Sequence, residues 1–366
     1  MPSFAADARS LALGFFAPWL VHGLVFLLHL VLPARGVEGY VRDAAGNRLR
    51  YRLNGLLVLG VVLALAFAAV RAGVVPADFL WVHRWEGLGG ACVLGLLFTF
   101  AMVLPAPPTS KGLAADLYLG RLENPQTPGG RADAKMVLYL VGAVLLELNL
   151  LSFAAHAAAV NGHLPASVAL HVALFSFFVC EYLFFEEVHL YTYDFFAERV
   201  GFKLGWGCIV FYPYFYGVGL WNVAGRPDPQ MPAWALVAAA AVFFTGWALS
   251  RGANLQKFWF KTQPSKHAFG VLVPGTVTDG ARTLLCSGFW GLSRHINYLG
   301  EVLMASGLAL ALGWPGAVGP WMYPLYYVAL LVPRQIDDDR RCQEKYGELW
   351  ARYCARVRWR IVPGIY

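Results

Sequence analysis

The chain has 366 residues and a net charge of +7; 58% of the residues are hydrophobic and only 14% are charged. Soluble globular domains usually carry about 25% charged residues, and a chain of this size still has to cover a surface. The composition therefore excludes an ordinary soluble enzyme, a disordered chain and a secreted disulfide scaffold, and it predicts a polytopic membrane protein.

Apolar stretches recur along the chain, and crossing the hydrocarbon core of a bilayer takes about 20 residues. The first stretch is typical of a transmembrane helix rather than a removed signal peptide, because a single Arg9 precedes it without a clear cleavage site. The pattern predicts nine or ten helices, with a partial or re-entrant span at 267–290. The expected spans are 12–33, 54–75, 87–105, 136–160, 165–188, 204–223, 232–250, 298–313 and 315–333.

The basic residues gather in four polar stretches, Arg42–Arg52, Lys111–Lys135, Arg251–Lys266 and Arg334–Arg360. Basic loops beside apolar spans follow the positive-inside rule, so we expect these stretches to face the cytoplasm. Nucleic-acid binding is a weaker interpretation, because no basic face stands apart from the apolar stretches. The six cysteines form no CxxC pair and no cluster with histidine, so we expect neither a disulfide framework nor a metal site.

Polar side chains also occur inside the apolar stretches, where they are costly and often functional. Each alone is more easily explained as a packing or helix-end group, but together they predict a polar cavity that reaches into the membrane. The first group, Glu147 with Asn149 and His156, lies in the middle of a span. The second group crowds the end of the next span and consists of Glu181, Glu186, Glu187 and His189.

The densest polar segment is LLCSGFWGLSRHINYLGE, residues 284–301. Its Arg294, His295 and Asn297 supply a guanidinium, an imidazole and an amide, which suits a phosphorylated or amide-bearing ligand. Upstream, SRGANLQKFWFK places Lys257 and Lys261 one helical turn apart on one side. These clusters predict a site for a polyanionic cofactor; the alternative is a basic belt that binds lipid phosphates.

The final stretch, residues 334–366, is charged and aromatic and leaves the bilayer core. At about 100° per residue, Arg334, Asp338 and Lys345 share one face of a helix. Tyr346 and Tyr353 form a second line on that helix if Gly347 does not break it. The pattern alone is equally consistent with an amphipathic helix on the membrane surface.

The segments SGFWGLSRHINYLGE and LVPRQIDDDRRCQEKYGELWARYCARVRWRIVPGIY resemble the two C-terminal signatures of the sterol reductases. This family includes the C14 and C24 sterol reductases, 7-dehydrocholesterol reductase and the lamin B receptor. The similarity extends upstream through GANLQKFWFK, VGFKLGWGCIVFYPYFY, GRLENP and YRLNGLL, so it covers nearly the whole chain. The resemblance implies a single all-α polytopic membrane domain, residues 1–366, with about ten transmembrane helices. Residues 1–230 would be mainly scaffold, and 231–366 a cytoplasmic-side cofactor-binding and catalytic half.

The resemblance also implies reduction of a sterol carbon–carbon double bond with NADPH. Lys257 and Lys261 would meet the phosphates of NADPH, and Tyr353 matches a tyrosine near the nicotinamide end. The other matching positions, which would line or close the cofactor site, are Trp290, His295, Asn297, Arg334, Asp338, Lys345 and Tyr346. No strand-borne GxGxxG motif is present, so side chains of this fold must hold the cofactor.

The chain departs from the family pattern in two places. The family commonly reads His-Arg-Glu-x-Arg-Asp where this chain has PRQIDD, so Arg334 and Asp338 persist but Asp337 replaces an arginine. The acidic-aromatic signature after GRLENP keeps only Asp133 and Lys135. The cofactor half is therefore better supported than the substrate half.

An isolated alkene must receive a proton before a hydride, because hydride does not add to an unpolarised double bond. Tyr353 and Tyr346, with Asp338 as a relay, are the candidate proton donors, although a tyrosine needs a lowered pKa for this work. Asp338 is equally well explained by binding the cofactor ribose or pairing with Arg334. Weaker candidates are Glu147, Glu181 and Glu187.

The intact NYLGE segment argues against the C24(28) branch, and the ending YCARVRWRIVPGIY is closer to the C14 reductases than to the C7 branch. We therefore expect reduction of the C14–C15 bond, with C7 or C24 activity as alternatives. A membrane methyltransferase and a non-catalytic sterol-binding protein are alternatives of another class. The paired lysines favour a phosphorylated dinucleotide as the cofactor, which argues against the methyltransferase. Only about eleven residues precede the first span, where the lamin B receptor has a soluble region, and this argues against a non-catalytic receptor. The Ala-, Gly- and Leu-rich composition predicts a bacterial inner membrane, or the endoplasmic reticulum in a eukaryote.

Overall fold

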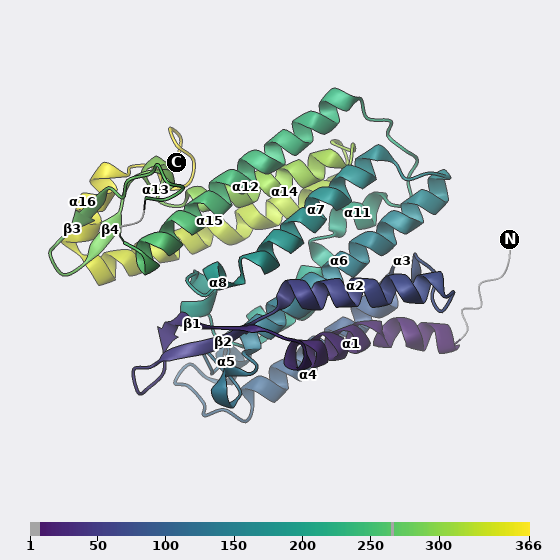
Figure 1. Cartoon of the computed structure of the whole chain (residues 1–366), viewed down its shortest axis with the longest axis horizontal. Helices are drawn as coiled ribbons and strands as arrows, with labels where there is room; N and C mark the ends of the chain where they lie inside the picture. The colour runs from purple at the N-terminus through teal and green to yellow at the C-terminus, as the bar shows by residue number, and fades with distance from the viewer. Residues whose placement is uncertain (1–7, 265–266) are drawn as a thin grey trace. The chain divides into compact units, whose positions relative to one another are not determined.

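The computed structural model describes residues 8–264 and 267–366, so Lys266, at the end of the third basic stretch, lies outside the described residues. The chain divides into two compact units, Met1–Asp228 and Pro229–Tyr366. Figure 1 shows the helices and strands of each unit.

The N-terminal unit is built around the long helix α6 (Ala134–Asn161), whose Leu138, Leu145 and Phe153 are buried in its core. Helices α1, α7 and the segment Gly207–Phe215 pack against α6. The other elements of this unit are α1 (Ala8–Val31), β1 (Arg35–Arg42), β2 (Arg48–Leu53), α2 (Gly55–Arg71), α3 (Phe79–Val82), α4 (Arg84–Val103), α5 (Leu113–Leu119), α7 (Ala166–Phe184), α8 (Glu186–His189), α9 (Tyr193–Phe196), α10 (Phe202–Trp206) and α11 (Val218–Val223).

Helices α1 and α4 approach each other closely because a glycine lies at their contact. A Cβ atom on Gly90 would overlap the carbonyl group of Phe15. The indole N–H of Trp19 donates a hydrogen bond to the Gly90 carbonyl at 2.9 Å. Small residues commonly permit such backbone approach between membrane helices.

The expected span 204–223 is not one regular helix. It comprises α10, the π-helix Gly207–Phe215 and α11. Pro213 lacks the N–H that a regular helical hydrogen bond needs, and Asn149 of α6 donates through Nδ2 to the Pro213 carbonyl at 2.9 Å. The proline and this cross-helix bond account for the irregular segment.

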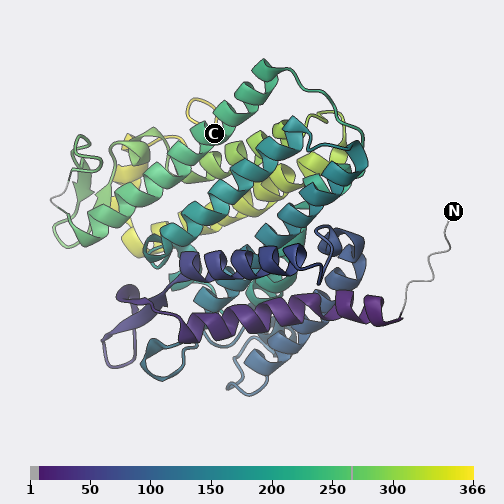
Figure 2. The same ribbon diagram turned by 45° about the vertical axis from the view of Figure 1, so that its right-hand side comes forward.

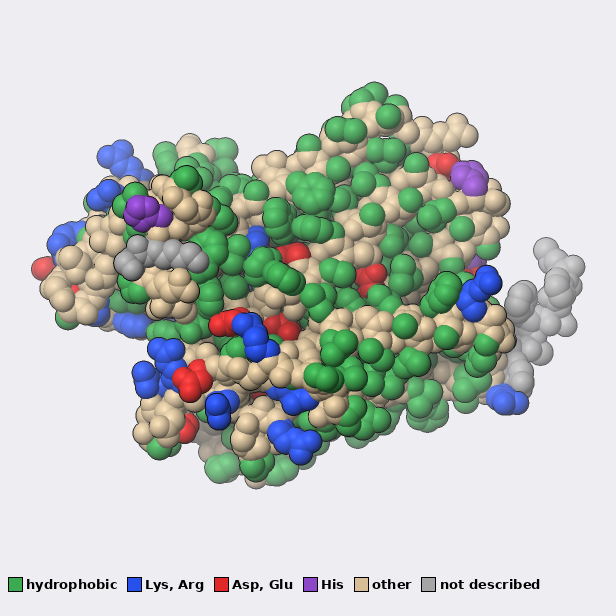
Figure 3. Space-filling model, in the orientation of Figure 1, with side chains coloured by type: hydrophobic (Ala, Val, Ile, Leu, Met, Phe, Trp, Pro, Cys, Tyr) green, Lys and Arg blue, Asp and Glu red, His purple; other side chains and the backbone are tan. Residues whose placement is uncertain are grey.

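An antiparallel hairpin between α1 and α2 departs from the all-α expectation. Its strands β1 and β2 pair Arg35 with Leu53 and Arg42 with Arg48. The Asp43 carboxylate closes the turn by accepting hydrogen bonds from the backbone N–H groups of Ala45 and Asn47. The first basic stretch therefore lies on this hairpin, whose basic side chains are all arginines and where blue side chains gather in Figure 3.

The C-terminal unit is centred on α12 (Ala233–Thr262) and α14 (Ile296–Ala311), which lie side by side in Figures 1 and 2. Glycines permit this contact, since a Cβ on Gly246 would lie 2.5 Å from the Met304 backbone nitrogen, and one on Gly300 2.5 Å from that of Ser250. The other elements are β3 (Thr276–Thr278), β4 (Thr283–Leu285), α13 (Phe289–Leu292), α15 (Val318–Tyr346) and α16 (Glu348–Arg356).

One expectation for the C-terminal unit is wrong. Residues 267–290 form no partial span; they carry the β3–β4 hairpin, because turns at Gly270 and Gly280 interrupt the apolar residues. Whether Tyr346 and Tyr353 share one helix depended on Gly347, and this glycine does break the helix. Gly347, at φ 53°, ends α15 after Tyr346, and α16 begins anew at Glu348.

Within the described residues, five helices are long and apolar enough to cross a membrane: α1, α4, α6, α7 and α12. Two shorter apolar helices are α2 and α14. Large hydrophobic side chains such as Leu20, Phe67 and Phe184 are exposed on these helices, and hydrophobic side chains cover much of the face drawn in Figure 3. Such exposure is unfavourable in water and expected in lipid. The chain is a polytopic helical membrane protein.

Candidate functional site

The C-terminal turns of α12 position the paired lysines beside a tryptophan. The Lys257 ammonium lies 5.2 Å from the centre of the Trp290 ring. Trp290 is fixed because its indole N–H donates to the Ala253 carbonyl at 2.8 Å. Gln256 binds the same segment twice, donating to the Ser287 carbonyl and accepting from the Phe289 N–H, both at 3.0 Å.

Positive charge is concentrated around these turns. The charges of Lys257 and Lys345 both act on Lys261, so three lysines from α12 and α15 lie near one another and form one lysine cluster. Asp338 supplies an opposite charge near Lys257. The Lys345 ammonium lies 5.2 Å from the Tyr346 ring centre, and Arg282 lies 5.6 Å from it. The structure thus brings together four of the predicted residues, Lys257, Lys261, Lys345 and Tyr346.

His295 lies between two carboxylates of α15. Its Nδ1 is 3.9 Å from Asp338 Oδ2, and its Nε2 is 3.9 Å from Asp339 Oδ1. The imidazole also stacks on Tyr298, with ring centres 4.9 Å apart, while its backbone N–H donates to the Arg360 carbonyl at 2.8 Å. Both predicted residues, His295 and Asp338, therefore lie in one ionic cluster.

Asp339 is the centre of that cluster, although the sequence analysis did not single it out. Its Oδ2 lies 3.2 Å from Arg294 Nη2 and 3.4 Å from Arg360 Nε, and it accepts from Gln335 Nε2 at 2.7 Å. Burial alone would raise the pKa of Asp339, but the hydrogen bonds and charges of His295 and Arg294 outweigh burial and lower it. A signal for Asp339 was available in the sequence. Asp339 follows Gln335 by four residues, which places the two side chains on one face of a helix.

Tyr353 is buried, with 4% of its surface exposed, in a small core with Cys286, Trp350 and Val357. Its ring stacks on Trp350 at 4.9 Å between ring centres. Tyr346 packs against the same core. Burial raises the pKa of Tyr353 and the nearby charge of Arg294 lowers it, with burial dominant.

The remaining predicted cofactor residues lie in the same unit. Arg334 is half-buried on α15 and has polar or ring partners of its own. The side-chain carbonyl oxygen of Asn297, at the start of α14, is buried without a hydrogen-bond partner among the described residues. A buried oxygen without a partner costs about 1–3 kcal/mol, which a donor on a bound ligand would recover.

Polar residues of the membrane helices are largely held by neighbouring helices. Glu147 accepts a hydrogen bond from the Ser176 hydroxyl at 2.6 Å. His156 lies 3.2 Å from Asp78 and stacks on Trp81. Together with the Asn149 bond described above, these contacts tie α6 to its neighbours.

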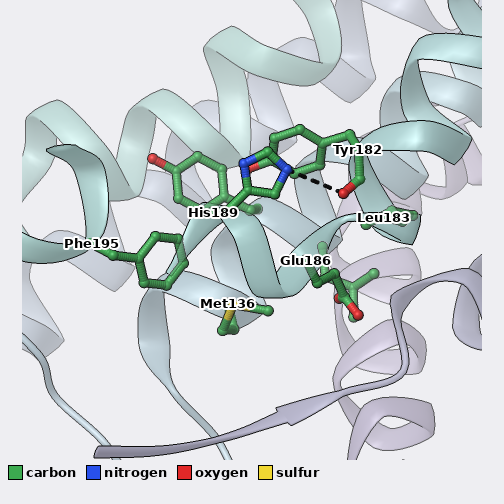
Figure 4. Close-up of a pocket in the computed structure, with 8 residues that line it drawn as sticks. Met136, Tyr182, Leu183, Glu186, His189 and Phe195 are labelled. Atoms are coloured by element: carbon green, nitrogen blue, oxygen red, sulfur yellow. Dashed lines mark hydrogen bonds between the residues drawn. The ribbon is translucent and has the colours of Figure 1, made fainter. Parts of the chain in front are cut away.

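The acidic group at the end of α7 separates into different environments. Glu187 forms an ion pair with exposed Arg35 at 2.6 Å, whereas Glu186 and His189 line a pocket with residues of α6, α7 and α9 (Figure 4). The pocket is lined by Met136, Tyr139, Leu140, Tyr182, Leu183, Glu186, His189 and Phe195. Of the residues expected to line a polar cavity, only Glu186 and His189 line this pocket, whose other walls are mainly apolar and aromatic; the polar cavity itself stays a prediction.

Asp133 and Lys135 hold the loop that precedes α6. Asp133 caps the helix by accepting from the Met136 N–H at 3.0 Å. The buried Lys135 ammonium donates to the carbonyls of Asp194 and Phe195 at 2.9 Å and to Asn124 Oδ1 at 3.2 Å. Their contacts give these residues a structural role.

Comparison with known proteins identifies the family of the chain. Residues 7–366 match the model of the "Ergosterol biosynthesis ERG4/ERG24 family". The chain is similar to proteins named Delta(14)-sterol reductase from Arabidopsis thaliana (32% identity over 92% of this chain and 91% of the relative), Methylotuvimicrobium alcaliphilum (31%; 97% and 83%) and Mus musculus (33%; 95% and 84%). The chain therefore belongs to the ergosterol biosynthesis ERG4/ERG24 family and is a sterol reductase-family oxidoreductase.

Proposed function

We propose that this protein uses NADPH to reduce the C14–C15 double bond of a sterol. The main support for this proposal is the name that similar proteins share. Proteins from a plant, a bacterium and a mammal, each aligned with more than nine-tenths of this chain, are named Delta(14)-sterol reductase. The lysine cluster of Lys257, Lys261 and Lys345 supports the choice of a phosphorylated cofactor, because its amines can each donate to phosphate oxygens.

The residues of the C-terminal unit fit NADPH by chemical type. The three lysines would hold its phosphates, because ammonium groups bind phosphate as point charges. The Trp290 ring offers a flat surface beside Lys257. The partnerless oxygen of Asn297 would accept a hydrogen bond from an amide or hydroxyl of the cofactor. Bound NADPH supplies the hydride of the reaction.

The chain itself must supply the proton. Burial raises the pKa of Tyr353, which disfavours proton donation, whereas the Arg294 charge acts in the opposite direction and would stabilise the tyrosinate left after proton transfer. Asp338 and Asp339 flank His295 and would orient its imidazole to return a proton. Tyr353 or Tyr346 therefore remain the proposed donors, with Asp338 as the relay.

The finer membrane architecture is part of the proposal. About ten spans, more than the five long apolar helices, would place all four basic stretches on the cytoplasmic side. The cofactor site would then face the cytoplasmic pool of NADPH. The similar protein from Methylotuvimicrobium alcaliphilum supports an inner-membrane location.

The cofactor assignment is tested by measuring NADPH and NADH affinity of the Lys257→Ala and Lys261→Ala variants. We expect each variant to bind NADPH at least about tenfold more weakly, since a charge-assisted hydrogen bond contributes roughly 1.5–3 kcal/mol. Lys203→Ala is the control, because Lys203 pairs with Glu198 in the N-terminal unit. Equal affinity in all three variants would contradict the assignment.

A further inference from the structure

The β3–β4 hairpin packs against α16 and the end of α15. Figure 1 shows its strands next to α16, and the Thr278 carbonyl of β3 accepts a hydrogen bond from Arg352 Nη2 of α16 at 2.9 Å. Val277 and Leu284, which pair across the two strands, pack against the small core that holds Tyr353. The hairpin therefore has a defined place in the C-terminal unit, although nothing in the proposed proton and hydride chemistry uses it.

Asp279 organises the turn of this hairpin and holds the Arg282 side chain. Its Oδ1 accepts hydrogen bonds from the backbone N–H groups of Ala281 and Arg282 at 3.0 and 2.7 Å. Its Oδ2 lies 3.1 Å from Arg282 Nε and 2.9 Å from Nη2. Hydrogen bonds, first that from the Arg282 backbone N–H, outweigh burial and lower the pKa of Asp279. A charged carboxylate thus orients the Arg282 guanidinium.

The oriented guanidinium reaches the end of α15. Arg282 Nη1 donates to the Lys345 carbonyl, and the guanidinium carbon lies 5.6 Å from the centre of the Tyr346 ring. Because Gly347 ends α15, the Lys345 carbonyl is among the last four of the helix, which have no donor within their own helix. A cation at this end also interacts favourably with the helix dipole. Arg282 therefore stabilises the turn that carries Lys345.

The position of this turn determines where the Lys345 ammonium lies. Helix ends fray, and a frayed turn would not keep the ammonium 5.2 Å from the Tyr346 ring centre, where it lies in the structure. Lys345 belongs to the lysine cluster with Lys257 and Lys261. A lysine on a fixed backbone loses less conformational freedom when it binds a phosphate, so fixing the turn should strengthen binding.

We propose that Arg282 is a positioning residue of the cofactor site, which holds the last turn of α15 so that Lys345 can bind a phosphate group; this rests on the proposed function. Arg282 is not itself a phosphate ligand in this arrangement. Its Nε and Nη2 bind Asp279, and its Nη1 binds the Lys345 carbonyl. Its contribution to cofactor affinity therefore passes through Lys345.

The test is a double-mutant cycle on NADPH affinity, measured with the full chain in detergent. Arg282→Ala should weaken NADPH binding about fivefold, which corresponds to one hydrogen bond of about 1 kcal/mol. In a chain that already carries Lys345→Ala, the same substitution should change the affinity less than about twofold, because the side chain that Arg282 positions is absent. Arg282→Gln removes the charge but keeps much of the stem, and it should give the same pattern, so the test does not depend on the folding of one variant.

Arg352→Ala is the matched control and should bind NADPH like the wild type. Its side chain also donates to a backbone carbonyl at this contact, but to that of Thr278 rather than that of Lys345. Equal weakening by Arg282→Ala with and without Lys345 would overturn the proposal, because Arg282 would then act on the cofactor by another route. Wild-type affinity of Arg282→Ala, or an equal loss in Arg352→Ala, would overturn it too.

Failure of the proposed function gives a different result. The wild type would then bind no NADPH, or Lys345→Ala would bind it as tightly as the wild type, and either outcome would overturn the role of Arg282 together with the function. Failure of the Arg282 proposal alone leaves NADPH binding and the loss in Lys345→Ala intact.

Discussion

Two carboxylates of α15, those of Asp339 and Asp337, lie in different surroundings. Their contributions to the free energy of unfolding therefore differ. Asp339 lies among Arg294, Gln335 and Arg360, and the Arg294 side chain is only 7% exposed. Asp337, two positions earlier, pairs with Arg340 and Arg341 on the exposed side of α15. Neighbouring positions on one helix thus separate a buried ionic network from a surface one.

Asp339→Ala should lower the free energy of unfolding by about 3 kcal/mol, because it leaves the buried Arg294 charge without its partner. Asp337→Ala should cost less than about 1 kcal/mol, since exposed ion pairs contribute little. Thermal unfolding of both variants in detergent measures the difference. Similar melting temperatures would show that Asp339 does not hold the C-terminal cluster together.

The stability of the protein should depend on pH through Glu186. Its pKa rises from 4.5 to about 7 in the folded protein because it is buried, so the folded state favours the protonated form. This stabilisation is fully present below pH 4.5 and is lost as the pH rises through 7. The loss is on the order of 3 kcal/mol from 1.36 kcal/mol per pKa unit.

Unfolding of the wild type and of Glu186→Gln between pH 4.5 and 8 measures this effect. Glutamine does not titrate, so the wild type should lose stability relative to the variant as the pH rises. A constant difference between the two proteins over this range would mean that Glu186 is not buried as described.

At the scale of elements, glycines decide how closely the helices of the C-terminal unit pack. Gly300→Ala should destabilise the protein by roughly 1–3 kcal/mol, because the added methyl group meets the α12 backbone and not a flexible side chain. Gly60→Ala on α2 is the matched control, since nothing lies within 4 Å of a Cβ there. Destabilisation by both variants alike would indicate a general intolerance of alanine rather than a close helix contact.

The sequence predicted most helices to within a few residues, because long apolar stretches have few alternatives in a membrane. The expected 136–160 and 298–313 correspond to α6 and α14. It misjudged 267–290 and 204–223, where turn glycines and Pro213 override hydropathy. Hydropathy averages over many residues, whereas a single proline or a glycine with positive φ changes the backbone at one position.

At the scale of the whole molecule, composition and long motifs were sufficient to predict the class of protein. Which side chains meet was harder to foresee. Lys257, Trp290 and Lys345 lie far apart in sequence and were grouped by resemblance, whereas the central position of Asp339 depends on contacts with Arg294 and Arg360. The spacing of Gln335 and Asp339 is visible within one helix, but contacts between separate segments leave no spacing pattern in the sequence.

The central claim is that the chain transfers a hydride from NADPH to a sterol. It is tested most directly with the purified full chain in detergent, NADPH deuterated at the transferred position, and a panel of Δ14, Δ7 and Δ24 sterols analysed by mass spectrometry. We predict a product from the Δ14 sterol with deuterium at C14. Deuterium only in the products of the Δ7 or Δ24 sterols would contradict the assigned bond, and transfer to no sterol would contradict the proposed reduction itself.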